Sequence, residues 1–142
     1  MVRELEEEKG GLLVLAMGGR GDGTPASRRL LEIAISLTAT ILNQATKRGR
    51  DVLLLLPDSM EAVEIRSGDR AQLRQAESLL AMLSNDPGWP DFAMLPDRAA
   101  GSATILVHPG MDEPAAPSGV ERISAEEVVA RGWFRPKGGG RG

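Results

Sequence analysis

The residues best suited to chemistry lie in the glycine-rich stretch Met17–Pro25, which reads MGGRGDGTP. A glycine-rich turn between a strand and a helix can present backbone N–H groups to a phosphate. A P-loop, however, needs Lys and then Ser or Thr at the end of the turn, and here Gly23 is followed by Thr24 and Pro25. A dinucleotide fingerprint needs a third Gly where this chain has Thr24. The stretch therefore favours a connecting loop, and an anion cradle at Gly18–Gly23 stays open as an alternative.

Further polar residues follow two other apolar runs, and parallel strands would bring their carboxyl ends to one edge of a sheet. His108 is the only histidine, which excludes a His-based metal cluster, and no Ser or Cys partner is visible for it as a general base. The sequence thus predicts no catalytic residue, no metal ligand and no cofactor. The predicted function of this edge is partner binding, by Gly18, Gly19, Arg20, Asp22, Thr24, Asp58, Ser59, His108 and Asp112.

The elements that position these residues begin with a strand–helix–strand unit. Leu12–Ala16 and Val52–Leu56 are short, continuous apolar runs, typical of strands buried on both faces of a parallel sheet. Between them, Arg28–Lys47 lacks Gly and Pro and is predicted to be a helix. Its polar residues fall on one narrow stripe, namely Glu32, Ser36, Thr40, Asn43 and Lys47. Such a helix is the crossover that a parallel strand pair requires.

The rest of the chain extends this unit. Ala62–Arg66 alternates apolar and polar residues and follows a short turn, which predicts an antiparallel edge strand, a place that suits the charged Glu64 and Arg66. Asp69 and Gln72 form a capping-box-like pair at the start of a helix that runs to Leu83. Trp89–Ser102 is irregular, with a short helical turn around Phe92–Leu95, and Trp89 and Phe92 are expected to cap the core.

Two strands and a helix complete the predicted fold. Ala103–Val107 is a clear strand and Val120–Ile123 a short one, while Ser124 and Glu127 predict a capped helix over Ala125–Ala130. Residues 1–130 are therefore expected to form one α/β domain. The basic, glycine-rich residues 131–142 are predicted to be a disordered tail.

The composition and net charge of the chain exclude several classes of protein. With 142 residues, 42% hydrophobic and 26% charged, the chain suits one globular domain. Cysteine is absent, so disulfides and thiolate metal sites are excluded. No run approaches the roughly 18–20 apolar residues of a membrane span, and no signal-peptide pattern is present. The net charge of −3 argues against nucleic acid as a partner.

Four stretches carry a resemblance to a known family: Val2–Glu6 (VRELE), Leu31–Ala39 (LEIAISLTA), Arg48–Leu55 (RGRDVLLL) and Leu79–Leu83 (LLAML). Over about Val2 to Pro109 the chain resembles the C-terminal, von Willebrand factor A-like half of the bacterial and archaeal domain-of-unknown-function family 58. The resemblance implies a Rossmann-like, doubly wound, mostly parallel sheet with one antiparallel edge strand. The chain order of the expected elements agrees with this fold.

The resemblance also implies a role and a location. Members of the family are commonly encoded beside MoxR-type AAA+ ATPases and are thought to help assemble or activate other complexes. Full-length members usually carry membrane-spanning segments ahead of this half, so the chain is expected to be a cytoplasmic part of a membrane-anchored protein, without membrane contact of its own.

The chain departs from the family pattern at its metal-ion-dependent adhesion site. Von Willebrand A domains that bind Mg²⁺ use an Asp-x-Ser-x-Ser motif after the first strand, because hard cations need converging oxygen ligands. The matching positions here are Ala16, Gly18 and Arg20, and an acidic residue expected after the fourth strand is replaced by His108 or Pro109. A makeshift site from Asp22, Thr24, Asp58 and Asp112 is a minor alternative.

Two functions of different class follow from these observations. The first is a metal-independent protein-interaction module whose partner, a MoxR-type AAA+ ATPase, docks on the carboxyl edge of the sheet. The second is an enzyme that handles phosphate or nucleotide through the Gly18–Gly23 loop. No Lys, paired acids or metal ligands support the second, so the first is favoured.

Overall fold

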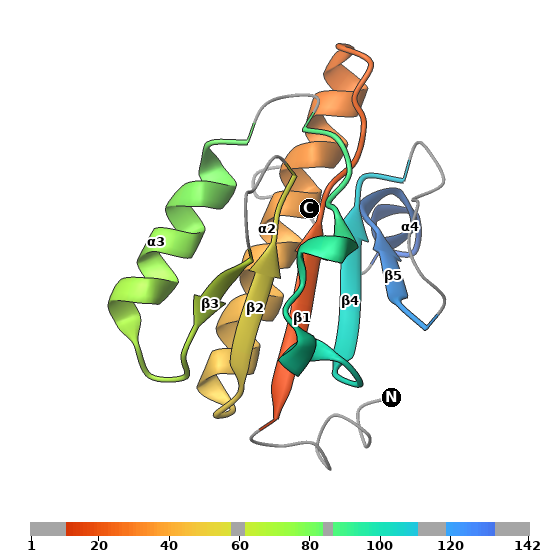
Figure 1. The fold of residues 1–142 in the computed structure, drawn as a ribbon. Coiled ribbons are helices and arrows are strands. Elements are labelled where there is room, and N and C mark those ends of the chain that lie inside the picture. The colour runs from red at the N-terminus through yellow and green to blue at the C-terminus, as the bar shows by residue number, and fades with distance from the viewer. Residues whose placement is uncertain (1–10, 58–61, 84–86, 111–118, 133–142) are drawn as a thin grey trace.

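The computed structural model describes residues 11–57, 62–83, 87–110 and 119–132, which form an α/β fold around one sheet (Figure 1). The sheet has five strands in the order β3-β2-β1-β4-β5. In chain order the strands are β1 (Leu12–Met17), β2 (Asp51–Leu55), β3 (Val63–Ile65), β4 (Ala103–His108) and β5 (Glu121–Ser124).

The central strand is β1, which pairs in parallel with a neighbour on each side. Its residue Val14 lies opposite Leu53 of β2 and Thr104 of β4. β5 continues the parallel arrangement beyond β4, whereas β3 pairs antiparallel with β2. All of β1 after Leu12 is buried, as expected for a parallel strand that is covered on both faces. The predicted Rossmann-like, mostly parallel sheet with one antiparallel edge strand is confirmed.

The crossover helix α2 (Pro25–Lys47) begins earlier than the Arg28 expected from the sequence pattern. Thr24 caps it, because the Thr24 side-chain oxygen accepts the N–H of Ser27 at 3.1 Å. Pro25 suits the first helical position, where a missing N–H costs nothing. After Lys47 the chain turns into β2 through Gly49, whose φ of +85° is a left-handed conformation that ends helices readily.

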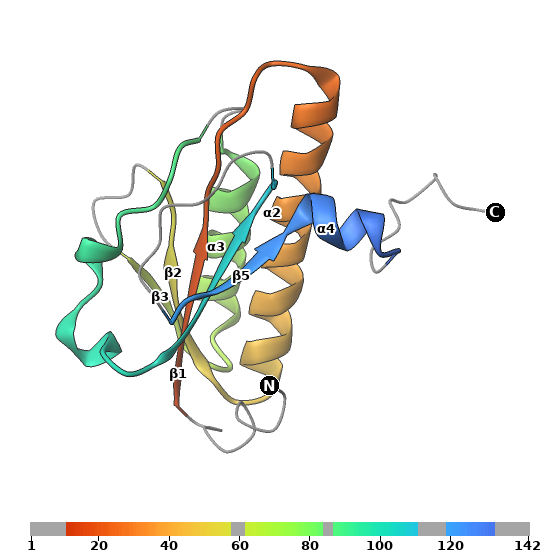
Figure 2. The same cartoon turned by 90° about the vertical axis from the view of Figure 1, so that its right-hand side faces the viewer.

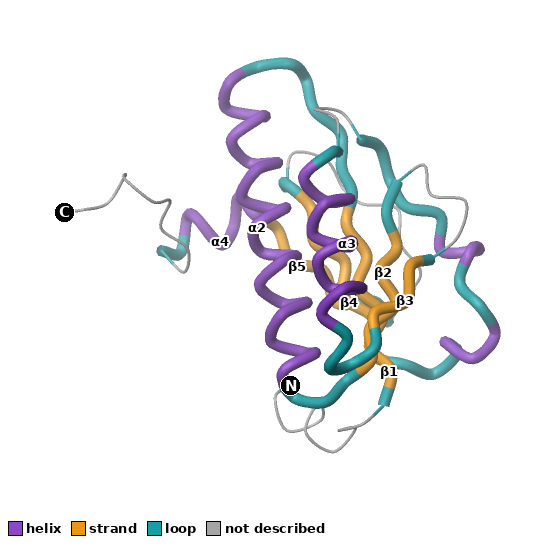
Figure 3. Tube along the Cα trace, turned by 90° about the vertical axis from the view of Figure 1, so that its left-hand side faces the viewer, coloured by secondary structure: helices purple, strands orange, loops and turns teal. Residues whose placement is uncertain are grey.

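Three helices form a layer on one face of the sheet (Figures 2 and 3). They are α2, α3 (Arg70–Ala81) and α4 (Ala125–Ala130). Leu13, Leu15 and Met17 of β1 share the core beneath them with Leu54 of β2 and Leu42 of α2. This layer contains the larger of the apolar clusters, so most of the hydrophobic stabilisation arises on this face.

The two later helices begin at the expected caps. Asp69 Oδ1 accepts the N–H of Gln72 at 3.0 Å, and Ser124 Oγ accepts that of Glu127 at 3.2 Å. The structure differs from the predicted capping box in the bond that the Gln72 side chain makes. Its Oε1 accepts the backbone N–H of Arg66 at 2.7 Å, because the turn after β3 brings that group within reach.

The predicted polar stripe of α2 also has one exception. Glu32, Ser36, Thr40 and Lys47 are exposed, but Asn43 is half-buried. Its Nδ2 donates to Glu77 of α3 at 2.9 Å, so the stripe meets α3 at this point.

The opposite face is covered by residues 87–102, which we call the strap (Figure 2). The strap contains two 3-10 turns, η1 (Phe92–Met94) and η2 (Asp97–Ala99). Trp89 and Phe92 pack on a cluster of Ala16, Leu55 and Leu106, so the prediction that they cap the core is confirmed. The chain thus passes over the second face as irregular structure on its way to β4, as its Pro content indicated.

Among the described residues, no helix is both long and apolar enough to span a membrane. Residues 133–142, most of the predicted tail, lie outside the described residues.

Candidate functional site

The predicted partner-binding edge is built around a close approach of backbone segments at the end of β1. Gly19 N donates to Gly88 O at 2.7 Å, and Gly88 N donates back to Gly19 O at 2.9 Å. Gly18 N donates to Val107 O of β4 at 3.2 Å. The end of β1 is therefore joined to β4 on one side and to the strap on the other.

Glycine is required at both positions of this junction. A Cβ on Gly18 would lie 2.5 Å from Cδ of Pro90 and 2.7 Å from the carbonyl oxygen of Gly88. Gly19 has φ +151°, and a Cβ there would collide with the ring of Pro109. Both glycines are buried, so their role in the structure is to let three chain segments meet.

The next part of the loop is held by its own polar groups. The Thr24 hydroxyl donates to Asp22 Oδ1 at 2.6 Å, and the Thr24 N–H donates to the same oxygen at 3.0 Å. Asp22 N in turn donates to Ser27 Oγ at 3.2 Å. The hydroxyl and the N–H of Thr24 lower the pKa of the Asp22 carboxyl below its ordinary value. Asp22 is therefore an ionised carboxylate beside the first turn of α2 at neutral pH, where the helix dipole favours negative charge.

Of the predicted site residues that the structure describes, three are exposed: Arg20, Asp22 and Thr24. Arg20 lies between the glycine junction and the Asp22–Thr24 turn, both of which are held by hydrogen bonds. These three residues, which we call the exposed loop, are the exposed part of the predicted edge among the residues that the structure describes.

His108 lies at the carboxyl end of β4, as expected, but it is buried. Its side chain is only 6% exposed, and its ring lies 6.0 Å from that of Trp89, measured between centroids. The next residue, Pro109, accepts the N–H of Glu126 at 2.9 Å and so joins the end of β4 to α4. His108 thus contributes to packing under the edge, and direct contact with a partner would need its burial to change.

Asp58, Ser59 and Asp112 lie outside the described residues, and Asp58 and Asp112 are two of the four members of the makeshift cation site. Ala16 and Gly18, at two of the three missing ligand positions, are buried in the end of β1. Within the described part of the chain, no three acidic, His or Cys side chains gather as a metal-binding group.

The sequence did not indicate how the strap contributes to this edge. Gly88 bonds Gly19 and Pro90 lies against Gly18, contacts that no pattern in the sequence predicts. The available signal was the glycine at 88, in a segment otherwise rich in Pro and aromatic residues. In the structure its φ is +88°. A scan of protein-family models and searches of curated proteins and of solved structures find no match to this chain.

Proposed function

We propose that this protein is a metal-independent protein-interaction module that binds its partner through the exposed loop, Arg20, Asp22 and Thr24. The observation that carries the proposal is the support of this loop. Backbone bonds hold it at Gly19, and side-chain bonds hold it between Asp22 and Ser27. A loop held in this way loses little conformational entropy on binding, and Arg is a common anchor at protein interfaces.

The charge of the loop disfavours the alternative of a phosphate- or nucleotide-handling enzyme. The position that a bound anion would take, at the first turn of α2, has the Asp22 carboxylate beside it. The N–H of Ser27 is already bonded to Thr24 and that of Thr24 to Asp22, so these donors are engaged. An anion would have to displace these bonds and overcome repulsion by the carboxylate.

We further propose a MoxR-type AAA+ ATPase as the partner and the cytoplasm as the compartment, with the parent protein anchored in a membrane. The support is the resemblance of Leu31–Ala39, Arg48–Leu55 and Leu79–Leu83 to the von Willebrand A-like half of family 58. The departures at Ala16, Gly18 and Arg20 support binding without a metal, because none of these residues offers an oxygen-bearing side chain.

The test is a binding titration of a purified MoxR-type ATPase on the immobilised chain. Arg20→Glu is expected to weaken binding roughly tenfold, because it reverses the charge of an interface Arg. Arg74→Glu is the matched control, since Arg74 is an exposed residue on α3 and the change in net charge is the same. Equal affinities for Arg20→Glu and the wild type would overturn the exposed loop as the binding site.

Thermal unfolding distinguishes the module from the enzyme. A ligand that binds only the folded chain must raise the melting temperature. Millimolar Mg²⁺, Mn²⁺ and ATP are each expected to leave it unchanged. A rise with ATP alone would favour the enzyme, and a rise with Mg²⁺ or Mn²⁺ would require a metal site.

A further inference from the structure

A group of exposed basic side chains lies at the opposite end of the sheet from the exposed loop. We call it the amino-edge surface and define it as Lys47, Arg48, Arg66 and Arg70, all of which are exposed. Lys47 and Arg48 end α2, while Arg66 follows β3 and Arg70 begins α3. In Figure 1 the end of α2 and the turn between β3 and α3 both lie at the lower end of the fold.

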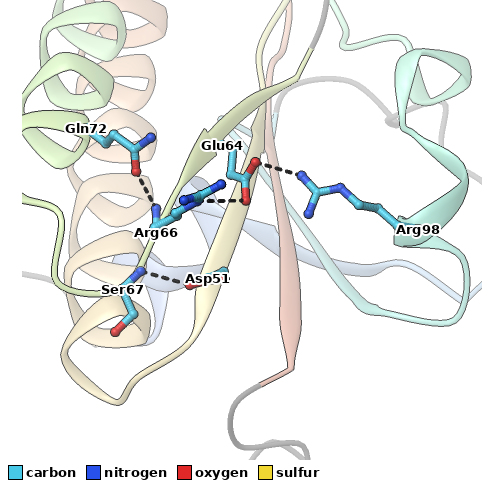
Figure 4. A network of polar contacts seen from close by, with 6 residues as sticks. All are labelled: Asp51, Glu64, Arg66, Ser67, Gln72 and Arg98. Carbon is cyan, nitrogen blue, oxygen red and sulfur yellow. Dashed lines mark hydrogen bonds and ion pairs between the residues drawn. The ribbon is translucent and has the colours of Figure 1, made fainter.

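Hydrogen bonds to Ser67 bring these residues together from separate parts of the chain. Ser67 Oγ donates to Thr46 O at 3.2 Å, and Ser67 N donates to Asp51 Oδ1 at 2.9 Å. The backbone of Arg66 is held by Gln72, as Figure 4 shows together with the Ser67–Asp51 bond. The turn that carries Arg66 is therefore fixed against the end of α2 and the start of β2.

The acidic side chains near this surface already have internal roles. Asp51 accepts the N–H of Ser67, and Asp69 caps α3. Glu64 is 2.9 Å from Arg98 but 3.7 Å from Arg66, whose side chain stays 70% exposed (Figure 4). Among the described residues of this surface, four bases therefore stand against the carboxylates of Asp51, Glu64 and Asp69, and Glu64 is shared with Arg98. An excess of positive charge remains toward solvent.

A buried base also lies at this end of the sheet. Arg50 is 5% exposed, and its Nη2 donates to Leu12 O at 3.3 Å. It therefore lies inside the amino end of the sheet, next to the strand pair of β1 and β2.

We propose that the amino-edge surface binds an acidic segment of a partner protein, such as a run of glutamates. The excess of basic side chains supplies the charge complementarity, and Arg66 and Arg70 can each bond carboxylates in a bidentate manner. Nucleic acid is the less suitable polyanion, because the whole chain carries net charge −3 and only 3% of its residues are aromatic. Together with the exposed loop, the domain has two docking surfaces at opposite edges and can join two partners.

Fluorescence anisotropy of a labelled hexaglutamate peptide tests this proposal with the full chain. Arg66→Gln/Arg70→Gln is expected to weaken binding roughly tenfold, as for two exposed ion pairs. Lys47→Gln/Arg48→Gln removes the other half of the surface independently and is expected to have a similar effect. Arg28→Gln/Arg29→Gln is the control, because these exposed residues lie at the far end of α2 and change the net charge equally. Binding should fall steeply with salt.

Three results would overturn the proposal. The first is an equal loss of affinity in the control variant, which would mean a response to net charge alone. The second is tighter binding of a dT12 oligonucleotide than of hexaglutamate, which would make nucleic acid the ligand. The third is carbodiimide cross-linking of Lys47 to the chain's own Glu4–Glu8 in preference to the peptide, which would mean that the surface binds a segment of the same chain and not a partner. Failure of this proposal and failure of the proposed function can be told apart, because Arg66→Gln/Arg70→Gln leaves the exposed loop unchanged. This variant should bind the MoxR-type ATPase as tightly as the wild type does.

Discussion

Single residues at the glycine junction decide whether three backbone segments can meet. Gly19→Ala is expected to destabilise the fold by about 2–4 kcal/mol, because the new Cβ combines an unfavourable φ with a collision against Pro109. Gly23→Ala is the matched control, since Gly23 has φ +81° but open space around it, and about 1 kcal/mol is expected there. Urea unfolding of both variants measures the difference. Equal losses would show that the collision is relieved at little cost.

The Asp22–Thr24 pair gives a prediction for pH. The pKa of Asp22 is lowered in the folded chain, so its contribution to stability is present above the unfolded pKa of about 3.9 and is lost as pH falls through the folded pKa. Thr24→Val removes the hydroxyl that is the main cause of the shift. The stability advantage of the wild type over Thr24→Val should therefore shrink as pH falls from about 6 to about 2. Thr24→Ser keeps a hydroxyl and should keep the advantage that Thr24→Val loses.

At the scale of elements, the ends of helices and the attachment of the strap are the testable features. Asp69→Ala is expected to cost about 1 kcal/mol, because it removes the side chain that caps α3. Asp69→Asn should recover most of this loss, since an amide oxygen also accepts the N–H of Gln72. Urea unfolding followed by circular dichroism measures both, and full stability in Asp69→Ala would contradict the role of this cap.

The strap is joined to the edge strand β3 by the ion pair of Arg98 and Glu64, shown in Figure 4. The Arg98 side chain is 53% exposed, so solvent screens the pair and its coupling energy should stay below about 1 kcal/mol. A double-mutant cycle with Arg98→Ala and Glu64→Ala measures this energy. The coupling should fall further in 1 M salt, where the Debye length is about 3 Å. A value that salt leaves unchanged would mean that packing, and not charge, joins the two elements.

At the scale of the whole molecule, both core layers share one sheet, which predicts a single cooperative unfolding transition. Leu54→Ala removes a fully buried side chain under α2 and is expected to cost about 3 kcal/mol. Trp89 lies on the opposite face, within the strap. Replacing Trp133 by Phe leaves Trp89 as the tryptophan that is observed. In that background, Leu54→Ala should lower the denaturant midpoint measured by Trp89 fluorescence and the midpoint measured by circular dichroism by the same amount. A Trp89 transition that stays at the wild-type midpoint would show that the strap unfolds by itself.

The sequence by itself determined the class of fold, because strong local patterns specify it. Leu12–Ala16 and Val52–Leu56 are too apolar for exposed strands, and the helix between them cannot bury its wide apolar face without a sheet. The caps at Asp69 and Ser124 were equally predictable, since a cap involves neighbours three residues away. The sequence pattern predicts that α2 starts at Arg28, later than the observed Pro25, because Thr24 and Pro25 suit a loop as well as a cap and first turn.

Only the tertiary structure decided which of the described candidate residues are exposed. The sequence does not rank Gly18, Gly19, Arg20 and His108 as candidates for partner binding. In the structure, the strap covers the two glycines and the histidine and leaves Arg20 exposed. The contact between Gly19 and Gly88 joins residues far apart in the chain, and no periodic pattern records it. The amino-edge surface arises in the same way, from a Ser67 turn that packs on the end of α2. Local sequence encodes elements through short-range bonds and periodic burial, whereas sites depend on long-range contacts that exist only after those elements pack.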